Sequence, residues 1–176
     1  DGDGAAEVIA YDHILDGQTG AVEVVLEHDG ATPYMMASVG DIDLDGVQEI
    51  VLGRHVYSPD GTIEWSAELI GERGHWSAIV NADDDDHGEV VMIADGRLAV
   101  YQHDGTPRVD VAAGAGNIGA PCVADFDGDG APEVGWASNN SAVSPNPTSS
   151  FATYNLDGSQ VWSRSVSDST GLLAGC

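Results

Sequence analysis

The chain has 176 residues, of which 30 are Asp or Glu and only five are cationic, so its formal net charge is −25. All five cations are arginines, at positions 54, 73, 97, 108 and 164, and lysine is absent. This charge excludes nucleic acid and anionic membranes as partners, because both require a basic patch, and the absence of lysine excludes Schiff-base and P-loop chemistry.

The remaining composition fits a folded protein. The apolar fraction of 42% is sufficient for a core, and the length suits one domain over residues 1–176. No apolar run approaches the ~20 residues of a membrane span, so membrane insertion is not expected.

Acidic segments recur at a regular interval along the chain. Their closing glutamates are Glu7, Glu49, Glu89 and Glu133, at spacings of 42, 40 and 44 residues. A period in the low forties is typical of a propeller blade. The predicted repeats cover approximately residues 1–34, 35–74, 75–117 and 118–170, and a further blade starts at 171–176.

Each repeat shows the same series of predicted elements: a strand, the acidic loop, a strand, a turn, a strand, an Asp-Gly turn and a fourth strand. Second strands are expected at 7–11, 49–52, 89–93 and 133–136, and third strands end at the Asp-Gly pairs 16–17, 60–61, 104–105 and 157–158. Such a pair between two strands favours a type I′ turn. No helical periodicity is present, and the polar residues 138–150 are expected to form a surface loop. The sequence therefore predicts an all-β fold of propeller-type blades with four antiparallel strands each.

The spacing of acids within each loop indicates a cation site. Side chains at positions 1, 3, 5 and 9, a carbonyl at position 7 and a glycine at position 6 give a set of hard oxygen ligands, which favours Ca²⁺ over Zn²⁺ and Mg²⁺. The predicted ligands are Asp41, Asp43, Asp45, the Val47 carbonyl and Glu49; Asn81, Asp83, Asp85, the His87 carbonyl and Glu89; Asp125, Asp127, Asp129, the Ala131 carbonyl and Glu133; and Asp1, Asp3 and Glu7. Three to four Ca²⁺ sites follow.

The four loops differ in completeness. Loops 41–49 and 125–133 contain every expected residue, whereas loop 81–89 has Asn81 at position 1 and Asp86 in place of glycine, where a strained backbone is expected. The first loop lacks its position 1. The alternative explanation for a single loop is an acidic turn on a salt-adapted surface. Salt adaptation is also an alternative explanation for the acidic residues outside the loops.

The acidic segments resemble the FG-GAP/VCBS repeat, the blade unit of integrin α-subunits and of many secreted bacterial proteins. Asp125-Phe-Asp-Gly-Asp-Gly-Ala-Pro-Glu-Val is similar to its consensus, and the VCBS side of the resemblance is the stronger one. The resemblance implies that each calcium loop joins the first and second strands of a blade.

In this register both ends of the chain lie inside a blade. Residue 1 falls within a loop, and Cys176 lies where Cys122 lies, three residues before the next loop. Three arrangements are compatible with this: part of a larger propeller, a four-bladed ring completed by Leu172–Cys176, or blades stacked between subunits in a fibre. Further blades or a second copy are expected to pair with the open strand edges.

The cysteines are not expected to form an intrachain disulfide. Ser38 and Ala78 occupy the repeat position of Cys122, which indicates a small buried strand site. Equivalent sites on successive blades are also expected to lie beyond the ~7 Å Cα limit for a disulfide.

Two of the tryptophans share a repeat position. Trp65 and Trp162 each follow the Asp of their Asp-Gly turn by five residues and are expected to pack between blades. His75 and Trp76 have no such equivalence and are the better candidates for a ligand site.

No catalytic arrangement is recognisable from the spacing of side chains. We expect an extracellular or cell-surface calcium-binding β-propeller segment with a structural, adhesion or assembly role, including fibre formation, and with a glycan or protein ligand as a further partner. The alternative is the propeller portion of a secreted carbohydrate-active enzyme or sugar-binding lectin.

Overall fold

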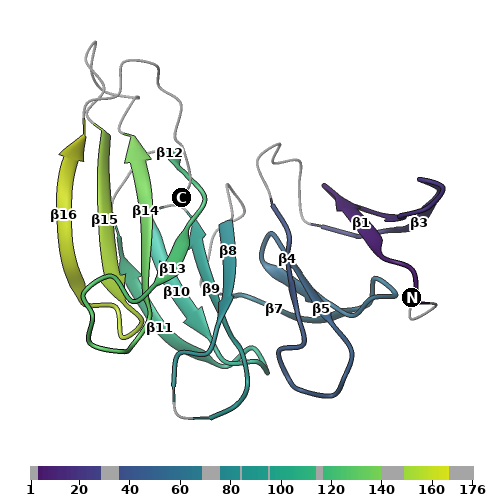
Figure 1. Cartoon of the computed structure of the whole chain (residues 1–176), viewed down its shortest axis with the longest axis horizontal. Coiled ribbons are helices and arrows are strands. Elements are labelled where there is room, and N and C mark those ends of the chain that lie inside the picture. Colours follow the sequence, from purple (N-terminus) through teal and green to yellow (C-terminus); the bar gives the residue numbers. More distant parts are fainter. Residues whose placement is uncertain are drawn as a thin grey trace.

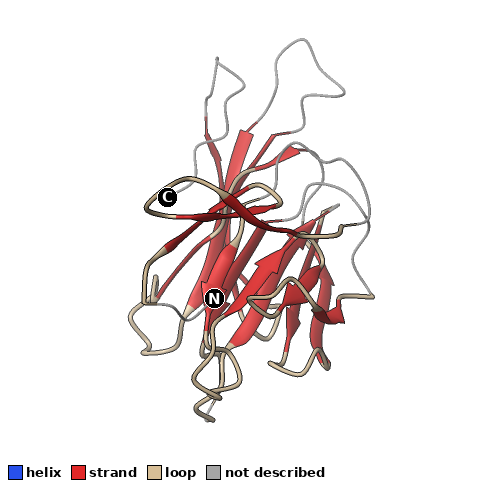
Figure 2. Ribbon diagram, turned by 90° about the vertical axis from the view of Figure 1, so that its right-hand side faces the viewer, coloured by secondary structure: helices blue, strands red, loops and turns tan. Residues whose placement is uncertain are grey.

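The structure is a computed structural model that describes residues 4–28, 36–68, 76–83, 85–94, 96–113, 117–139 and 149–166. Within these ranges every regular element is a β-strand and no helix occurs (Figure 2). The all-β prediction is therefore confirmed. In the same ranges there is no long apolar helix that could span a membrane.

The strands form four antiparallel sheets in chain order (Figure 1). The first sheet contains β1 (Glu7–Ala10), β2 (His13–Asp16) and β3 (Val22–Val25). The second contains β4 (Ser38–Gly40), β5 (Glu49–Leu52), β6 (His55–Tyr57) and β7 (Ile63–Ser66). The third contains β8 (Trp76–Val80), β9 (Glu89–Ala94), β10 (Arg97–Tyr101) and β11 (Pro107–Ala112). The fourth contains β12 (Asn117–Ile118), β13 (Cys122–Ala124), β14 (Glu133–Asn139), β15 (Ser149–Asn155) and β16 (Gln160–Val166).

Sequential strands are neighbours in each sheet, except β12 and β13. The second and third sheets have the expected four strands, the first has three, and in the fourth both β12 and β13 pair with β14. The part of the chain described here does not close into a barrel or a ring. The expected loop over 138–150 is shorter than predicted, because β14 extends to Asn139 and β15 begins at Ser149; residues 140–148 lie outside the described ranges.

The sheets pack face to face, with a separate core between each pair of neighbours. In β9, Val90 and Met92 belong to the core shared with the second sheet, whereas Val91 and Ile93 belong to the core shared with the fourth. Side chains alternate between the two faces of a strand. The apolar run of β9 is continuous because both of its faces are buried.

The Asp-Gly turns are not type I′. Gly61, Gly105 and Gly158 have φ of 85°, 82° and 89°, but the aspartates before them are not in the left-handed region. The carboxylate of each aspartate accepts the N–H two residues later, from Thr62, Thr106 or Ser159. A register shift follows each turn. These features belong to a longer hairpin loop in which a left-handed glycine forms a bulge, and the type I′ prediction was wrong.

The expectation about the cysteines was also wrong, because Cys122 on β13 is disulfide-bonded. Cys176, the only other cysteine in the sequence, lies outside the described residues. The expectation assumed that the first strands of successive sheets lie far apart. Ser38 on β4 and Ser77 on β8 show that they approach closely, with their Oγ atoms 3.1 Å apart.

Candidate metal sites in three acidic loops

Each of the three described acidic loops joins the first strand of a sheet to the second. Loop 41–49 follows β4, loop 81–89 follows β8, and loop 125–133 follows β13. All three lie at the same end of their sheets, the lower side in Figure 1. This position agrees with the one implied by the sequence resemblance.

The closing glutamate of each loop is a buried side chain at the start of the second strand. Glu49 is 2% exposed, and Glu89 and Glu133 are 0% exposed. One oxygen, Oε2, accepts the backbone N–H of the second loop residue: Ile42 at 2.8 Å, Ala82 at 2.5 Å and Phe126 at 2.7 Å. The glutamate thus fixes the loop over the end of its own strand.

The second oxygen of two of these glutamates has no partner. Oε1 of Glu89 and Oε1 of Glu133 are buried and accept no hydrogen bond, and the same is true of Oδ1 of Asp41. A buried carboxylate oxygen without a donor is costly. A cation held by the loop would satisfy these atoms, so the residues present fit a metal ion.

Burial also shifts the pKa of two closing glutamates, Glu49 and Glu89. It raises the pKa of Glu49 and of Glu89 above the ordinary value, although the hydrogen bond from Ile42 or Ala82 lowers it. The nearby loop aspartates, Asp43 among them, raise the pKa further by charge repulsion. A divalent cation would relieve that repulsion.

The aspartates at positions 3 and 5 hold the loop in shape. Oδ1 of the position-3 aspartate accepts the N–H of position 5, as from Asp45 to Asp43 at 3.1 Å and from Asp129 to Asp127 at 3.2 Å. Oδ1 of the position-5 aspartate accepts the N–H of position 7, from Val47, His87 or Ala131. One oxygen of each aspartate is therefore used inside the loop. The other is left for a ligand, except in Asp83, whose Oδ2 accepts hydrogen bonds from Gln102 and Arg108.

Two left-handed residues close the loops in the second and fourth sheets. In loop 41–49 they are Leu44 and Gly46, with φ of 62° and 92°, and in loop 125–133 they are Gly128 and Gly130, with φ of 82° and 94°. The position-6 N–H then reaches back to Oδ2 of position 1: Gly46 donates to Asp41 at 3.1 Å and Gly130 to Asp125 at 3.0 Å.

The third loop closes differently. Asp86 does not adopt a left-handed conformation, so the expected strain at this residue is absent. The Asn81 amide instead donates to the Asp85 carbonyl at 2.6 Å. In this loop a side-chain donor at position 1 contacts position 5.

Carboxylate oxygens converge in all three loops. In each of three groups, one oxygen per residue lies within 4.8 Å of the others: Asp41, Asp43 and Asp45; Asp83, Asp85 and Glu89; Asp125, Asp127 and Glu133. Glu49 and Asp129 stand outside these groups. The structure thus brings together most of the acidic residues predicted from the sequence, in groups that could hold a metal ion.

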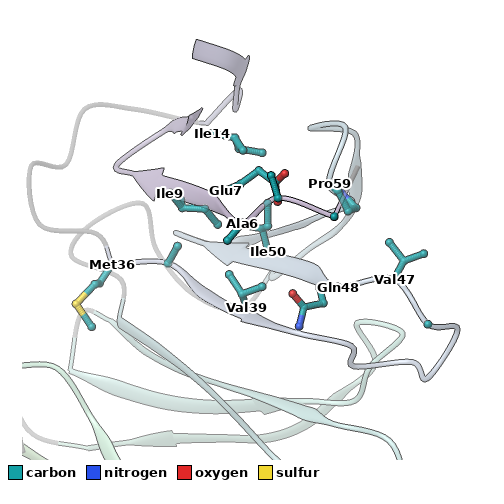
Figure 3. Close-up of a pocket in the computed structure, with 14 residues that line it drawn as sticks. Ala6, Glu7, Ile9, Ile14, Met36, Val39, Val47, Gln48, Ile50 and Pro59 are labelled. Atoms are coloured by element: carbon teal, nitrogen blue, oxygen red, sulfur yellow. The ribbon is translucent and has the colours of Figure 1, made fainter. Parts of the chain in front are cut away.

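Of the ligands predicted for the first loop, Asp1 and Asp3 lie outside the described residues. Glu7 is half-buried, unlike the other three glutamates. It lines a cavity of about 880 Å³ between the first and second sheets, together with apolar side chains such as Ile9, Ile14, Val39 and Ile50 (Figure 3).

The tryptophan proposed as a ligand residue has a packing role. Trp76 Nε1 donates to the Ile118 carbonyl at 3.0 Å, which links the third sheet to the fourth; His75 lies outside the described residues. Trp65 packs between sheets as expected, since its Nε1 donates to the His103 carbonyl at 2.8 Å.

Sequence reasoning missed several residues near the third loop. Arg108 and Gln102 contact Asp83, and the ring of His103 stacks on that of His87 at 4.1 Å. Arg108 belongs to the fourth strand, and Gln102 and His103 belong to the turn before it. These residues are far from the loop in sequence, and no motif connects them to it.

Comparison with known proteins gives structural likenesses only. No family model matches the sequence, and no curated protein matches it. Among solved structures, the biofilm matrix protein Bap1 of V. cholerae is similar at 28% identity with a TM-score of 0.72. The likeness covers 94% of this chain but only 27% of Bap1, so this chain spans about a quarter of that protein.

A second similar structure is a rhamnogalacturonan lyase, PL11, of Bacillus licheniformis. The identity is 20% and the TM-score is 0.54, over 83% of this chain and 38% of the lyase. At this identity the likeness shows the fold alone.

Proposed function

We propose that this chain is a calcium-stabilised segment of an extracellular structural protein, with a role in adhesion or matrix assembly. The observation that carries the proposal is the presence of buried carboxylate oxygens without donors, on Glu89 and Glu133, within groups of converging carboxylates. Such a site is costly when empty and favourable when it holds a cation.

Calcium is the proposed ion because the available donors are all oxygens. The ligands would be the aspartates at positions 1, 3 and 5 and the closing glutamate, with Asn81 at position 1 of the third loop and the carbonyls of Val47, His87 and Ala131 in addition. Ca²⁺ accepts six to eight oxygen ligands in flexible geometry. Binding to the folded state alone adds about 2.7 kcal/mol of stability per site at a hundredfold excess over Kd.

The same proposal includes the blade arrangement. Sheets of sequential antiparallel strands, stacked face to face and each with an acidic loop at one end, are the parts of an FG-GAP/VCBS-type propeller. The likeness to a biofilm matrix protein supports an extracellular location and a matrix role. The likeness to a lyase is one of fold and gives no support to an enzyme.

Calcium titration tests the proposed function. Thermal unfolding of the protein would be followed in EDTA and then at increasing Ca²⁺, with Mg²⁺ at equal concentration as the control. We expect a melting temperature that rises steeply with Ca²⁺ and weakly with Mg²⁺. An unchanged melting temperature would contradict the proposal.

A partner for assembly is suggested by Trp162. In β16 it occupies the place that Trp65 has in β7, because each follows the residue skipped by a register shift. Trp162 is 36% exposed and stacks on Phe151 at 5.8 Å, whereas Trp65 packs on the next sheet. We propose that this face accepts a further sheet of the same kind, and that a second copy of this chain supplies it.

Sedimentation velocity tests the assembly. Wild type is expected to self-associate with increasing concentration, and Trp162→Ala should weaken the association. Ser163→Ala, an exposed residue of the same strand whose side chain alternates to the opposite face, is the matched control and should have little effect. Wild type that stays monomeric at the highest concentration would contradict a second copy as the partner.

A further inference from the structure

Asp83, at position 3 of the third loop, is engaged by side chains from outside the loop. Its Oδ2 accepts hydrogen bonds from Arg108 Nη1 at 3.0 Å and from Gln102 Nε2 at 3.2 Å. Its Oδ1 accepts the N–H of Asp85 at 2.9 Å. Both oxygens of Asp83 are therefore occupied.

The equivalent aspartates keep one oxygen available. Oδ1 of Asp43 and of Asp127 accepts the position-5 N–H, as in the third loop. No described residue donates a hydrogen bond to Oδ2 of either one. A cation at the third loop must compete with Arg108 for Oδ2 of the position-3 aspartate. In the other two loops this oxygen accepts no hydrogen bond from a described residue.

Arg108 is placed there by a bulge in the fourth strand of its sheet. Val100 pairs with Val109 and Tyr101 with Pro107, so residue 108 has no partner in the ladder. A bulge redirects the side chain of the extra residue. We call this extra residue the bulge residue; the register shifts of the four sheets give Glu23, Glu64, Arg108 and Val161.

The bulge residue carries a different charge in each of the three sheets with a described loop. In the second sheet it is Glu64, which the register shift between Val56 and Tyr57 places at the same position of the fourth strand as Arg108 in the third sheet. In the fourth sheet it is the neutral Val161. The same structural position thus adds a negative charge, a positive charge or none beside the acidic loop.

We infer that the bulge residue sets the cation affinity of the acidic loop in its own sheet. This inference rests on the proposed calcium binding. Glu64 strengthens the site of loop 41–49 by adding negative charge. Arg108 weakens the site of loop 81–89, because its guanidinium repels the cation and occupies Asp83. Loop 125–133, beside Val161, is intermediate, and the protein fills its sites in this order as Ca²⁺ increases.

Charge changes at the bulge residue test the inference in the full chain. Isothermal titration with Ca²⁺ should show stepwise binding, with the third loop weakest. Arg108→Glu should tighten the weakest step by about tenfold, because it changes the charge near the dication by two units at the surface. Arg108→Gln changes the charge by one unit and should tighten the step less. Glu64→Gln should weaken the tightest step by a few-fold.

The control is Arg97→Gln. Arg97 forms an ion pair with Asp110 in the same sheet, with an Nε to Oδ1 distance of 2.8 Å, and neither residue belongs to a loop. Breaking this pair should leave every binding step unchanged. Circular dichroism would verify that each variant remains folded.

The site assignment needs a background in which only the third loop binds. Asp43→Asn with Asp127→Asn weakens the other two loops, and Arg108→Gln is then added. A tightened single step supports the inference. An affinity that does not respond to residue 108, in this background or in the wild-type chain, overturns the inference and leaves calcium binding intact. Absence of any Ca²⁺ binding by the wild-type chain overturns both.

Discussion

The indole of Trp65 lies directly over Gly105 of the next sheet. A methyl group added at Gly105 would lie 2.8 Å from Trp65 Cδ2, closer than side-chain atoms approach one another. Val24 lies over Gly61 in the same way, and Val109 and Val111 lie over Gly158. Gly61, Gly105 and Gly158 therefore each have two functions: the glycine adopts a positive φ, and it lets the last strand of the preceding sheet pack against the turn.

Gly105→Ala should lower the free energy of unfolding by about 2 to 4 kcal/mol, because it combines backbone strain with overpacking against Trp65. Gly20→Ala is the control, since Gly20 also has a positive φ, 72°, but a methyl group there would meet nothing within 4 Å. This control should cost only about 1 kcal/mol. Urea unfolding measures both, and equal losses would contradict the packing role.

Glu133→Gln distinguishes the role of Glu133 as a cation ligand from its role as the acceptor that holds the loop. The amide oxygen of glutamine can still accept the Phe126 N–H, so the stability in EDTA should decrease only modestly. In Ca²⁺ the variant should lose most of one site's stabilisation, about 2 to 3 kcal/mol at a hundredfold excess over Kd. Thermal unfolding with and without Ca²⁺ measures the two effects.

Glu133→Leu is the comparison for the same residue. It removes both the acceptor for Phe126 and the charge, so it should destabilise the protein in EDTA as well as in Ca²⁺. If Glu133→Gln behaved like wild type in Ca²⁺, the closing glutamate would not be a ligand.

Leu44→Gly should not destabilise the metal-free protein. Leu44 has φ of 62° and is 53% exposed, so glycine relieves strain of about 1 kcal/mol while few contacts are lost. Val47 in the same loop is 45% exposed without a positive φ, and Val47→Gly should cost about 1 kcal/mol. Urea unfolding in EDTA would detect the difference; equal losses would show that Leu44 is not strained.

The stability of the protein in EDTA should decrease as the pH decreases, because the turn aspartates become protonated. Hydrogen bonds from the Ser159 hydroxyl and N–H lower the pKa of Asp157 below its ordinary value of 3.8. Since the folded-state pKa is the lower one, this contribution is complete above about pH 3.8 and is lost as the pH falls through the folded-state value.

Asp157→Asn tests this directly because asparagine keeps an acceptor oxygen but does not titrate. The difference in melting temperature between wild type and variant should be constant from about pH 7 to pH 5 and should shrink below about pH 3.8. A difference in melting temperature that stays constant down to pH 3 would show that protonation of Asp157 does not affect the stability.

Much of the local structure could be predicted from the sequence. The acidic spacing located the three loops, and the β-branched runs after Glu49, Glu89 and Glu133 located the second strands, because these signals are local and recur in register. The turn geometry at Asp104-Gly105 was predicted incorrectly, since the aspartate carboxylate competes with the backbone pattern of a type I′ turn.

The sequence by itself determined an all-β chain with acidic loops of cation-binding composition. Only the tertiary structure decided which oxygens remain without donors, that Cys122 is disulfide-bonded, and that Arg108 reaches Asp83. The physical reason is that these features depend on contacts between strands far apart in the chain. A bulge that redirects one side chain by one register position cannot be read from residue spacing, yet it decides which charge stands beside each loop.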